Sequence, residues 1–239
     1  MQSKNGKKLK DIFISGLESS ILSGELRPGD RLRPERELAL QYGISRSSVN
    51  QGILDLERMG FLRIVPRKGT FVAEYKKKAT PSTMAALMQY DSTLVDSSLF
   101  RDLMDMRILI ERECVRLACG KAGTDDLLEL EQINEQIHTS SGENLTEAIY
   151  SYHLCLVQMS ENAAYTMIFQ SFEKMLKNMI VAHYSGTDEI RKTQPDYDGL
   201  TSAVALRDAE NADRMIVKLL GSASEYLNGM LKGRIKHEC

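Results

Sequence analysis

A run of short hydroxyl side chains surrounds one arginine at residues 43–52, where the sequence reads GISRSSVNQG. The start of a helix attracts phosphate, because its first N–H groups are unpaired and the helix dipole is positive there. An arginine and several hydroxyls at such an end would strengthen the attraction for an anion. The anion-binding candidates of the run are Ser45, Arg46, Ser47 and Ser48.

Two side chains of this run match the edges of DNA bases. Arginine can donate two hydrogen bonds to guanine in the major groove, and asparagine can pair with adenine in the same way. We therefore expect Arg46 and Asn50 to contact bases, and the serines to hold phosphates. No acidic residue lies three or four positions from Arg46, which favours a nucleic-acid partner over an internal ion pair. Ser45 has a second interpretation, because a serine at this position also caps a helix without any ligand.

Three predicted helices and a hairpin must hold these residues in place. The apolar spacing and the turn residues predict helices at Leu9–Ser23, Glu35–Gly43 and Ser45–Gly60 and strands at Phe61–Val65 and Thr70–Val72. Ile44 before the cap and Val49 inside the third helix have the spacing of a hydrophobic staple. Two short helices joined by a tight turn indicate a helix-turn-helix, and the hairpin, with its basic tip at 66–69, makes it a winged helix.

The charges are divided unevenly along the chain. Residues 1–80 hold 16 Lys and Arg against 9 Asp and Glu, whereas the whole chain has 31 against 33 and a net charge of −2. A basic block followed by an acidic one indicates two domains with different partners, nucleic acid being the partner of the first. We predict a DNA-binding domain at residues 1–75, a polar linker at 76–98 and a second domain at 99–239.

From about residue 99 the pattern is helical, with almost no strand signal. Amphipathic segments follow one another with short polar breaks at Leu99–Cys119, Asp125–His138, Leu145–Ser160, Ala163–His183, Asp188–Leu206 and Ala209–Leu231. The expected fold is therefore mainly α, a winged helix-turn-helix followed by an antiparallel all-α bundle of about six helices. No apolar run approaches the roughly 18 residues that cross a bilayer, and the four cysteines lack the spacing of a zinc or redox site. We expect a cytoplasmic protein with no membrane partner.

Four motifs stand in order within RLRPERELALQYGISRSSVNQGILDLERMGFLRIVPRKGTFV, residues 31–72. They resemble the pattern L-P-S-E-R-E-L-A, G-V-S-R-T-T-V-R, L-E-x-x-G and G-x-G-T-F-V of the GntR superfamily of bacterial transcription regulators. The resemblance implies a winged helix that binds a two-fold symmetric DNA operator as a homodimer. The positions that match the family's DNA contacts are Arg36, Arg46, Ser47, Ser48 and, at the wing tip, Lys68 and Gly69. Two positions depart from the pattern, since Asn50 stands where arginine is usual and Arg67 where glycine is common.

The helical part is similar, more loosely, to the FadR-type effector domain of the same superfamily. The likeness rests on DLMDMRILIERECVRLAC, which contains Arg107, and on YHLCLVQMSEN, which contains His153. Many such domains hold a divalent metal through one Asp and three His. The corresponding positions here are Ile149, His153, Tyr197 and Leu219. One ligand of four remains, so we predict no metal and no other cofactor.

We expect a small effector to contact Arg107, His153 and Tyr197. Arg107 lies on an apolar helical stripe, where a charge is costly unless it is paired. An anionic effector, such as a carboxylate or an acyl-CoA ester, would pair it, and so would an internal ion pair with Glu111 one turn away. His153 has an alternative reading as a hydrogen-bonded core histidine.

These patterns predict a ligand-responsive transcription regulator, a repressor that binds an inverted-repeat operator as a homodimer. The chain has no Gly-rich phosphate loop, no H-E-x-x-H and no nucleophile motif, which argues against an enzyme. Two alternatives stay open at this point. The second domain would serve only dimerisation in one of them, and in the other its pocket would be catalytic.

Overall fold

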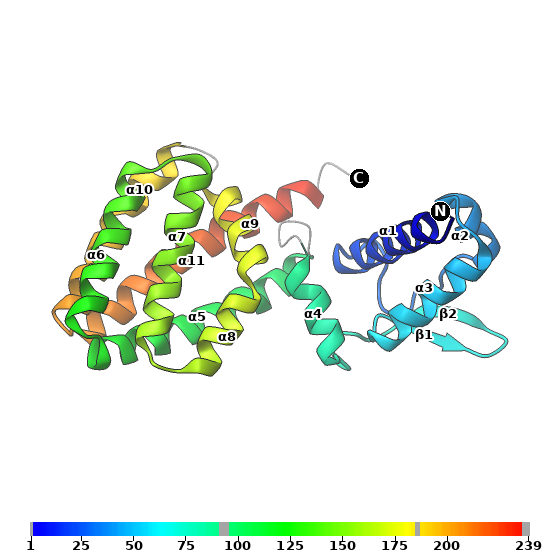
Figure 1. Ribbon diagram of the computed structural model, residues 1–239, viewed down its shortest axis with the longest axis horizontal. Coiled ribbons are helices and arrows are strands. Elements are labelled where there is room, and N and C mark those ends of the chain that lie inside the picture. Colours follow the sequence, from blue (N-terminus) through cyan, green and yellow to red (C-terminus); the bar gives the residue numbers. More distant parts are fainter. Residues whose placement is uncertain (1, 91–95, 185–186, 236–239) are drawn as a thin grey trace. The chain divides into compact units, whose positions relative to one another are not determined.

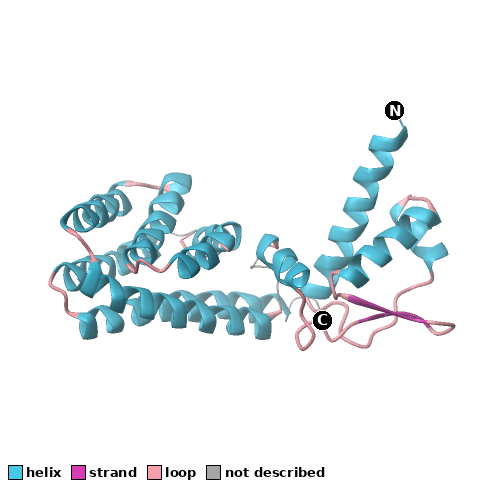
Figure 2. Ribbon diagram, turned by 60° about the horizontal axis from the view of Figure 1, so that its bottom comes forward, coloured by secondary structure: helices cyan, strands magenta, loops and turns pink. Residues whose placement is uncertain are grey.

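The computed structural model describes residues 2–90, 96–184 and 187–235, which fall into two compact units. Residues 2–90 with 96 form an N-terminal unit, and the described residues from 97 onward form a helical unit. In these ranges the chain has eleven helices and one two-stranded sheet (Figures 1 and 2). The predicted mainly α fold class is confirmed. None of the described helices is long and apolar enough to cross a membrane.

The N-terminal unit is a winged helix with one added helix. Its elements are α1 (Gln2–Leu22), α2 (Glu35–Tyr42), α3 (Arg46–Arg58), β1 (Leu62–Val65), β2 (Gly69–Val72) and α4 (Pro81–Gln89). Helices α2 and α3 form the helix-turn-helix, and the β1–β2 hairpin is the wing (Figure 2). Both features are those that the sequence predicts.

Helix α3 begins where its sequence predicts. Ser45 is the N-cap, and its Oγ accepts a hydrogen bond from the N–H of Ser48 at 3.0 Å. Val49, in the first turn, is fully buried. Gly52 lies so close to Phe13 of α1 that a Cβ there would stand 2.6 Å from the ring. A larger residue at position 52 would therefore push α1 and α3 apart, and with them the orientation of the exposed face of α3.

The wing is a short antiparallel hairpin tied to α3. Its two strands pair over their whole length, with Leu62 opposite Val72 at the base. The carboxylate of Glu57, near the end of α3, accepts the N–H of Ile64 in β1 at 2.7 Å. Because Leu62 and Val72 are both buried, the base of the wing is part of the core and only its tip projects.

Helix α4 lies within residues 76–98, the segment that the sequence predicts as a linker. Thr80 is its N-cap, and the hydroxyls of Thr80 and Thr83 both donate to the carbonyl of Met59 at the end of α3. These hydrogen bonds hold α4 on the N-terminal unit. The domain boundaries proposed from composition stay a prediction.

The helical unit has seven helices in its described ranges. They are α5 (Ser97–Lys121), α6 (Thr124–Thr139), α7 (Gly142–Met159), α8 (Ala163–Ser171), α9 (Glu173–His183), α10 (Thr187–Ala205) and α11 (Ala209–Ile235). The sequence predicts one helix over Ala163–His183, whereas the structure divides this segment at Phe172. The N–H of Phe172 bonds to the carbonyl of Phe169, three residues back instead of four, and this tighter turn interrupts the α-helical pattern.

The first and last helices of this unit pack side by side (Figure 1). Arg112 of α5 donates two hydrogen bonds, of 2.7 and 2.8 Å, to the carboxylate of Asp213 in α11. At the end of α5, Arg207 donates to the carbonyls of Cys119 and Ala122 at 2.9 and 2.7 Å. The last carbonyls of a helix have no partner of their own, so α5 is capped by a side chain from the turn between α10 and α11.

Candidate nucleic-acid interface and ligand pocket

The N-terminal end of α3 presents an arginine and a serine to solvent. Arg46 and Ser47 are exposed, and Arg46 has no hydrogen bond or ion pair within the described part of the chain. Ser48 is half-buried, and its hydroxyl lies 2.9 Å from that of Ser45. These two serines bond to each other at the cap, so their geometry agrees with the capping interpretation of Ser45.

Two more predicted contacts lie on α2 and α3. Arg36, the second residue of α2, is exposed and has no ion pair among the described residues. Asn50 is exposed too, one turn into α3, and its Nδ2 donates to Oε1 of Glu35 at 3.1 Å. The bond to Glu35 fixes the amide of Asn50 and leaves its oxygen and second N–H available to a base.

The wing tip adds two basic side chains on an uncommon backbone. Arg67 and Lys68 are exposed, and Arg67 is in the left-handed region with φ at 64°. Gly69 has φ at 116°, and a Cβ there would stand 3.0 Å from Nε of Arg31. Arg31 reaches the wing through an isolated bridge to Phe71 on the free edge of β2. The sequence pattern does not predict that Arg31 lies at the wing, because this bridge brings it there from a separate loop.

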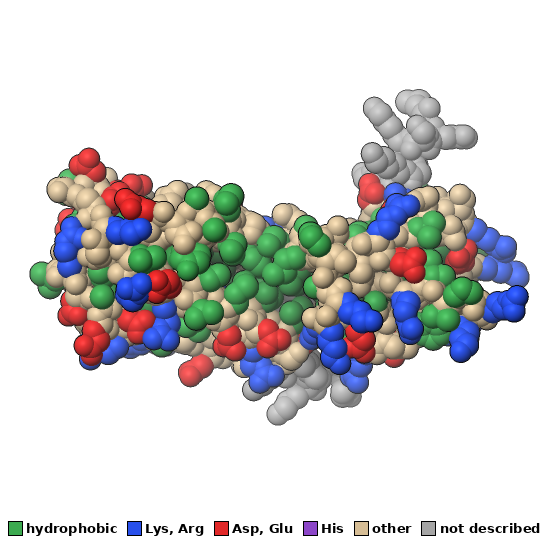
Figure 3. Space-filling model, turned by 90° about the horizontal axis from the view of Figure 1, so that it is seen from below, with side chains coloured by type: hydrophobic (Ala, Val, Ile, Leu, Met, Phe, Trp, Pro, Cys, Tyr) green, Lys and Arg blue, Asp and Glu red, His purple; other side chains and the backbone are tan. Residues whose placement is uncertain are grey.

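Lys and Arg side chains gather on the visible face of the N-terminal unit (Figure 3). The predicted contacts come from three places within this one unit: the start of α2, the start of α3 and the wing tip. Helix N-termini and guanidinium groups together suit a phosphate backbone. Their contact with DNA stays a prediction.

The helical unit buries a cluster of three ionisable side chains. Arg107 Nε donates to Glu111 Oε1 at 2.6 Å, and His153 Nδ1 lies 2.5 Å from Glu111 Oε2. Glu111 and His153 are each 2 % exposed and Arg107 is 10 % exposed. Burial alone would raise the pKa of Glu111, but the attraction of Arg107 and His153 outweighs it and lowers the pKa to about 2. Both interpretations that need no ligand are therefore present: Arg107 forms an internal ion pair with Glu111, and His153 is a hydrogen-bonded core histidine.

Tyr197 of α10 lies against the same cluster. Its ring packs edge-on to His153 with centroids 6.1 Å apart, and its hydroxyl lies 3.3 Å from that of Tyr184. Burial raises the pKa of Tyr197 well above its usual value, so its hydroxyl stays protonated. Arg107, His153 and Tyr197 all line one cavity, of about 320 Å³ including its mouth, and the structure thus brings together the three residues predicted to meet an effector.

The positions that resemble the family's metal ligands also meet in this cavity. Ile149 and Leu219 line it beside His153 and Tyr197, but neither has a donor atom. The nearby carboxylates of Asp196 and Asp198 are engaged elsewhere, by Lys218 at 2.6 Å and by His138 at 2.7 Å. Among the described residues no three His, Cys, Asp or Glu side chains form a group that could hold a metal. These residues do not fit a divalent metal, which needs three or four donors.

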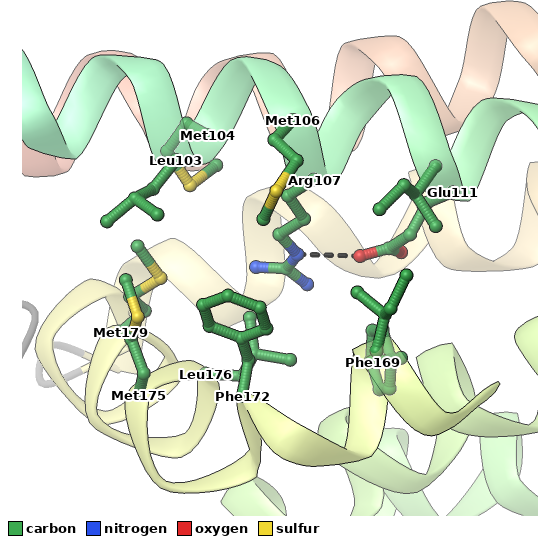
Figure 4. A pocket seen from close by; sticks show the side chains of 12 residues that line it. Leu103, Met104, Met106, Arg107, Glu111, Phe169, Phe172, Met175, Leu176 and Met179 are labelled. Carbon is green, nitrogen blue, oxygen red and sulfur yellow. Dashed lines mark hydrogen bonds and ion pairs between the residues drawn. The ribbon is translucent and has the colours of Figure 1, made fainter. Parts of the chain in front are cut away.

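Arg107 also lines a second cavity, of about 420 Å³ including its mouth. Apart from Arg107 and Glu111 its wall, formed by α5, α8 and α9, is apolar (Figure 4). The apolar wall residues are Leu103, Met104, Met106, Ile110, Ile168, Phe169, Phe172, Met175, Leu176 and Met179. We name this cavity the methionine chamber. The sequence pattern does not reveal the chamber, because its wall comes from two distant stretches of chain.

Two family profiles match the chain, one for each unit. Residues 14–72 match the bacterial regulatory proteins of the gntR family. Residues 102–222 match the FCD domain. The two matches fall in the winged helix and in the helical unit, and the second alone covers half of the chain.

Similar proteins and structures agree with these matches. The chain is 23% identical over 225 residues to the HTH-type transcriptional regulator LutR of Bacillus subtilis, covering 90% of this chain and all of LutR. It is 24% identical over 179 residues to the Glc operon transcriptional activator of Escherichia coli, covering 72% and 68%. The structure of a GntR family transcriptional regulator from Pseudomonas syringae matches with a TM-score of 0.54 and 20% identity, covering 97% and 89%. That of Lar, which controls expression of the Listeria monocytogenes agr system, gives 0.58 and 18%, covering 91% and 95%.

Proposed function

The chain belongs to the GntR family of bacterial regulatory proteins and carries an FCD domain, and from this premise we propose a repressor that responds to a small anionic ligand. Regulators of this family bind DNA, and FCD domains bind small-molecule effectors. The chain is accordingly a transcription regulator and not an enzyme. The homodimer, the operator, the direction of regulation and the class of effector are our proposals.

The proposal of operator binding rests on the exposed end of α3. Arg46 and Ser47 stand free at a helix N-terminus, with Arg36 and Lys68 exposed on α2 and on the wing. We propose that α3 of each subunit enters the major groove, with Arg46 and Asn50 at base edges, Arg36, Ser47 and Ser48 at phosphates and the wing tip of Lys68 and Gly69 on the flanking backbone. Two subunits would then read half-sites about one helical turn apart. A cytoplasmic site of action follows from this DNA target.

Ligand response is proposed for the helical unit. The cavity shared by Arg107, His153 and Tyr197 supports this proposal, since a cation and two polar aromatic side chains line it together. Ligand binding would shift the equilibrium between DNA-binding and released arrangements, with a coupling of roughly 1–3 kcal/mol. We propose that the ligand weakens operator binding, as in a repressor that is relieved by its effector.

Selection of bound sequences from a random DNA pool, with purified protein at a stated salt concentration, tests the DNA half of the proposal. We expect a short inverted repeat with half-sites about one turn apart. Loss of enrichment in an Arg46→Ala variant that keeps its fold would connect the repeat to α3. Enrichment no greater than that of a non-specific basic protein would contradict operator reading.

A further inference from the structure

The loop before α2 adds a third segment to the sheet of the wing. The N–H of Leu32 donates to the carbonyl of Thr70 in β2 at 2.9 Å. Arg31 lies opposite Phe71 in an antiparallel bridge. The loop is therefore held along the free edge of β2, and the side chain of Arg31 has a defined place on the wing.

Three side chains form a row across the outer face of the wing. Phe71 stands opposite Arg63 of β1 on one side and opposite Arg31 on the other. Residues that stand opposite each other in neighbouring strands project to the same face of a sheet. The adjacent positions Leu32 and Leu62 project to the other face and are buried, whereas both arginines are exposed and Phe71 is half-buried. We name these three outward-facing residues the wing row.

Arg31 extends along the outer face toward the wing tip. Its Nε lies 3.0 Å, and its Nη2 3.3 Å, from the point where a Cβ of Gly69 would stand. Gly69 is two residues before Phe71 in β2 and so belongs to the same face. The guanidinium of Arg31 thus lies over a stretch of backbone without a side chain, next to Lys68. The wing row continues into the tip for which we have proposed DNA contact.

The two cations of the wing row have no acidic partner. Neither Arg31 nor Arg63 has an ion pair or a hydrogen bond from its side chain within the described ranges. The neighbouring carboxylate of Asp30 accepts the N–H of Arg27 instead, at 2.8 Å. Neighbouring strands lie about 4.8 Å apart, so the arginines stand roughly 10 Å apart across the sheet, about one Debye length at 0.1 M salt. Two cations at this spacing reinforce each other's attraction for a polyanion.

We propose that the wing row binds the phosphate backbone of DNA beside the site of α3. Arg31 and Arg63 each hold a phosphate through charge-assisted hydrogen bonds, and Phe71 offers an apolar surface to the deoxyribose between them. These contacts carry no sequence information, because every nucleotide has the same phosphate. This inference rests on the proposed DNA binding and adds two contact residues outside the positions that match the family's DNA contacts.

The surroundings of the wing row favour DNA over an acidic protein as its partner. Arg67 and Lys68 are exposed at the tip of the same hairpin, so cations continue from the outer face to the tip. The evenly spaced charges of a DNA strand match a series of separate cations. The centre of a protein interface, in contrast, is usually depleted of charged residues.

Salt-dependent DNA binding of the full-length protein tests the proposal. Dissociation constants are measured by fluorescence anisotropy between about 50 and 200 mM salt, on the selected operator and on a scrambled duplex. The variants are Arg31→Gln, Arg63→Gln and the two combined. Arg58→Gln is the matched control, an exposed arginine of the same unit that pairs with Asp55 at 3.1 Å. Thermal unfolding checks that each variant keeps its fold.

We expect each single variant to bind both duplexes roughly tenfold more weakly at about 0.1 M salt. The slope of log K against log salt should become shallower by about 0.9 in each and by about twice as much in the combined variant. The loss should be equal on the operator and on the scrambled duplex, unlike the loss of a base contact. Arg58→Gln should match the wild type in affinity and in slope.

Arg31→Lys separates DNA contact from support of the wing, because it keeps the charge and loses the planar group over Gly69. Its slope should stay that of the wild type. A slope as shallow as that of Arg31→Gln would assign Arg31 to the shape of the wing tip and overturn the proposal. Unchanged slopes in all variants would also overturn it and would favour a protein partner for the wing row. Failure to select any operator would contradict the proposed function, whereas the slopes on scrambled DNA would still decide the role of the wing row.

Discussion

Replacing Glu111 by glutamine shows how much one buried charge contributes to the stability of the helical unit. The side chain keeps its size and an oxygen for the N–H of Arg107, whereas the negative charge is lost. Glu111 is 2 % exposed and bonds both Arg107 and His153. Breaking a buried ion pair by removing one partner costs about 3–5 kcal/mol, because the other charge stays buried and unmatched.

The pKa of Glu111 gives a second route to the same magnitude. A carboxyl whose pKa falls from 4.5 to about 2 on folding contributes about 3 kcal/mol of stability at neutral pH. Since the pKa is lower in the folded state, this contribution is complete above pH 4.5 and is lost as the pH falls toward about 2. The stability difference between wild type and Glu111→Gln is therefore expected to be largest at neutral pH and to shrink in acid.

Differential scanning calorimetry is the suitable assay, because it can separate the unfolding of two units. We expect the midpoint of the helical unit to fall by roughly 5 to 15 °C. Glu113→Gln is the matched control on the same helix, since Glu113 pairs with Arg116 at an exposed site, and its effect is expected within about 0–1 kcal/mol. Adding Arg107→Met to Glu111→Gln should restore much of the loss, because the unmatched cation is then gone too. Equal small effects of Glu111→Gln and Glu113→Gln would refute the reasoning.

Three further predictions concern the N-terminal unit. Arg46→Ala should cost about 1–3 kcal/mol of binding to the selected operator and much less on scrambled DNA, in titrations at one salt concentration; an equal loss on both would make Arg46 a phosphate contact. Ser45→Ala should lower the stability of the N-terminal unit by about 1 kcal/mol through loss of the α3 cap, seen in its calorimetric midpoint, and an unchanged midpoint would argue against the capping role. Arg67→Gly removes a left-handed arginine, which costs roughly 1–2 kcal/mol, but gains the entropic penalty of glycine, about 0.5–1 kcal/mol. The unfolding midpoint of the N-terminal unit in Arg67→Gly should therefore stay the same or rise, while its DNA affinity falls. Undiminished affinity would show that the wing tip does not touch DNA.

The winged helix could be predicted from sequence because its signals are local. Ser45, Ile44 and Val49 mark the start of α3 within six consecutive positions, and the cap is a hydrogen bond between residues three apart. The bridge from Arg31 to the wing has no such signal. It depends on how a loop passes along the edge of a strand, and residue types alone do not reveal this.

The helical unit shows the same division between near and distant partners. The pairing of Arg107 with Glu111 follows from helical spacing, which predicts it as the alternative to an anionic effector. The bond between Glu111 and His153 joins two helices and has no counterpart in the local pattern. The break at Phe172 was missed because neither glycine nor proline marks it, and the apolar periodicity continues on both sides.

The capping of α5 by Arg207 has a consequence for the order of events on the ribosome. Helix α5 opens the helical unit, yet the donors that cap its end come from Arg207, and its most extensive packing is against α11. Until that later part of the chain has been translated, α5 can pack on α7 but lacks its cap and its most extensive neighbour. The winged helix has its contacts within the first hundred residues and can close while translation continues. The helical unit must wait for the last stretch of this sequence, so the DNA-binding half is expected to mature before the half that senses the ligand.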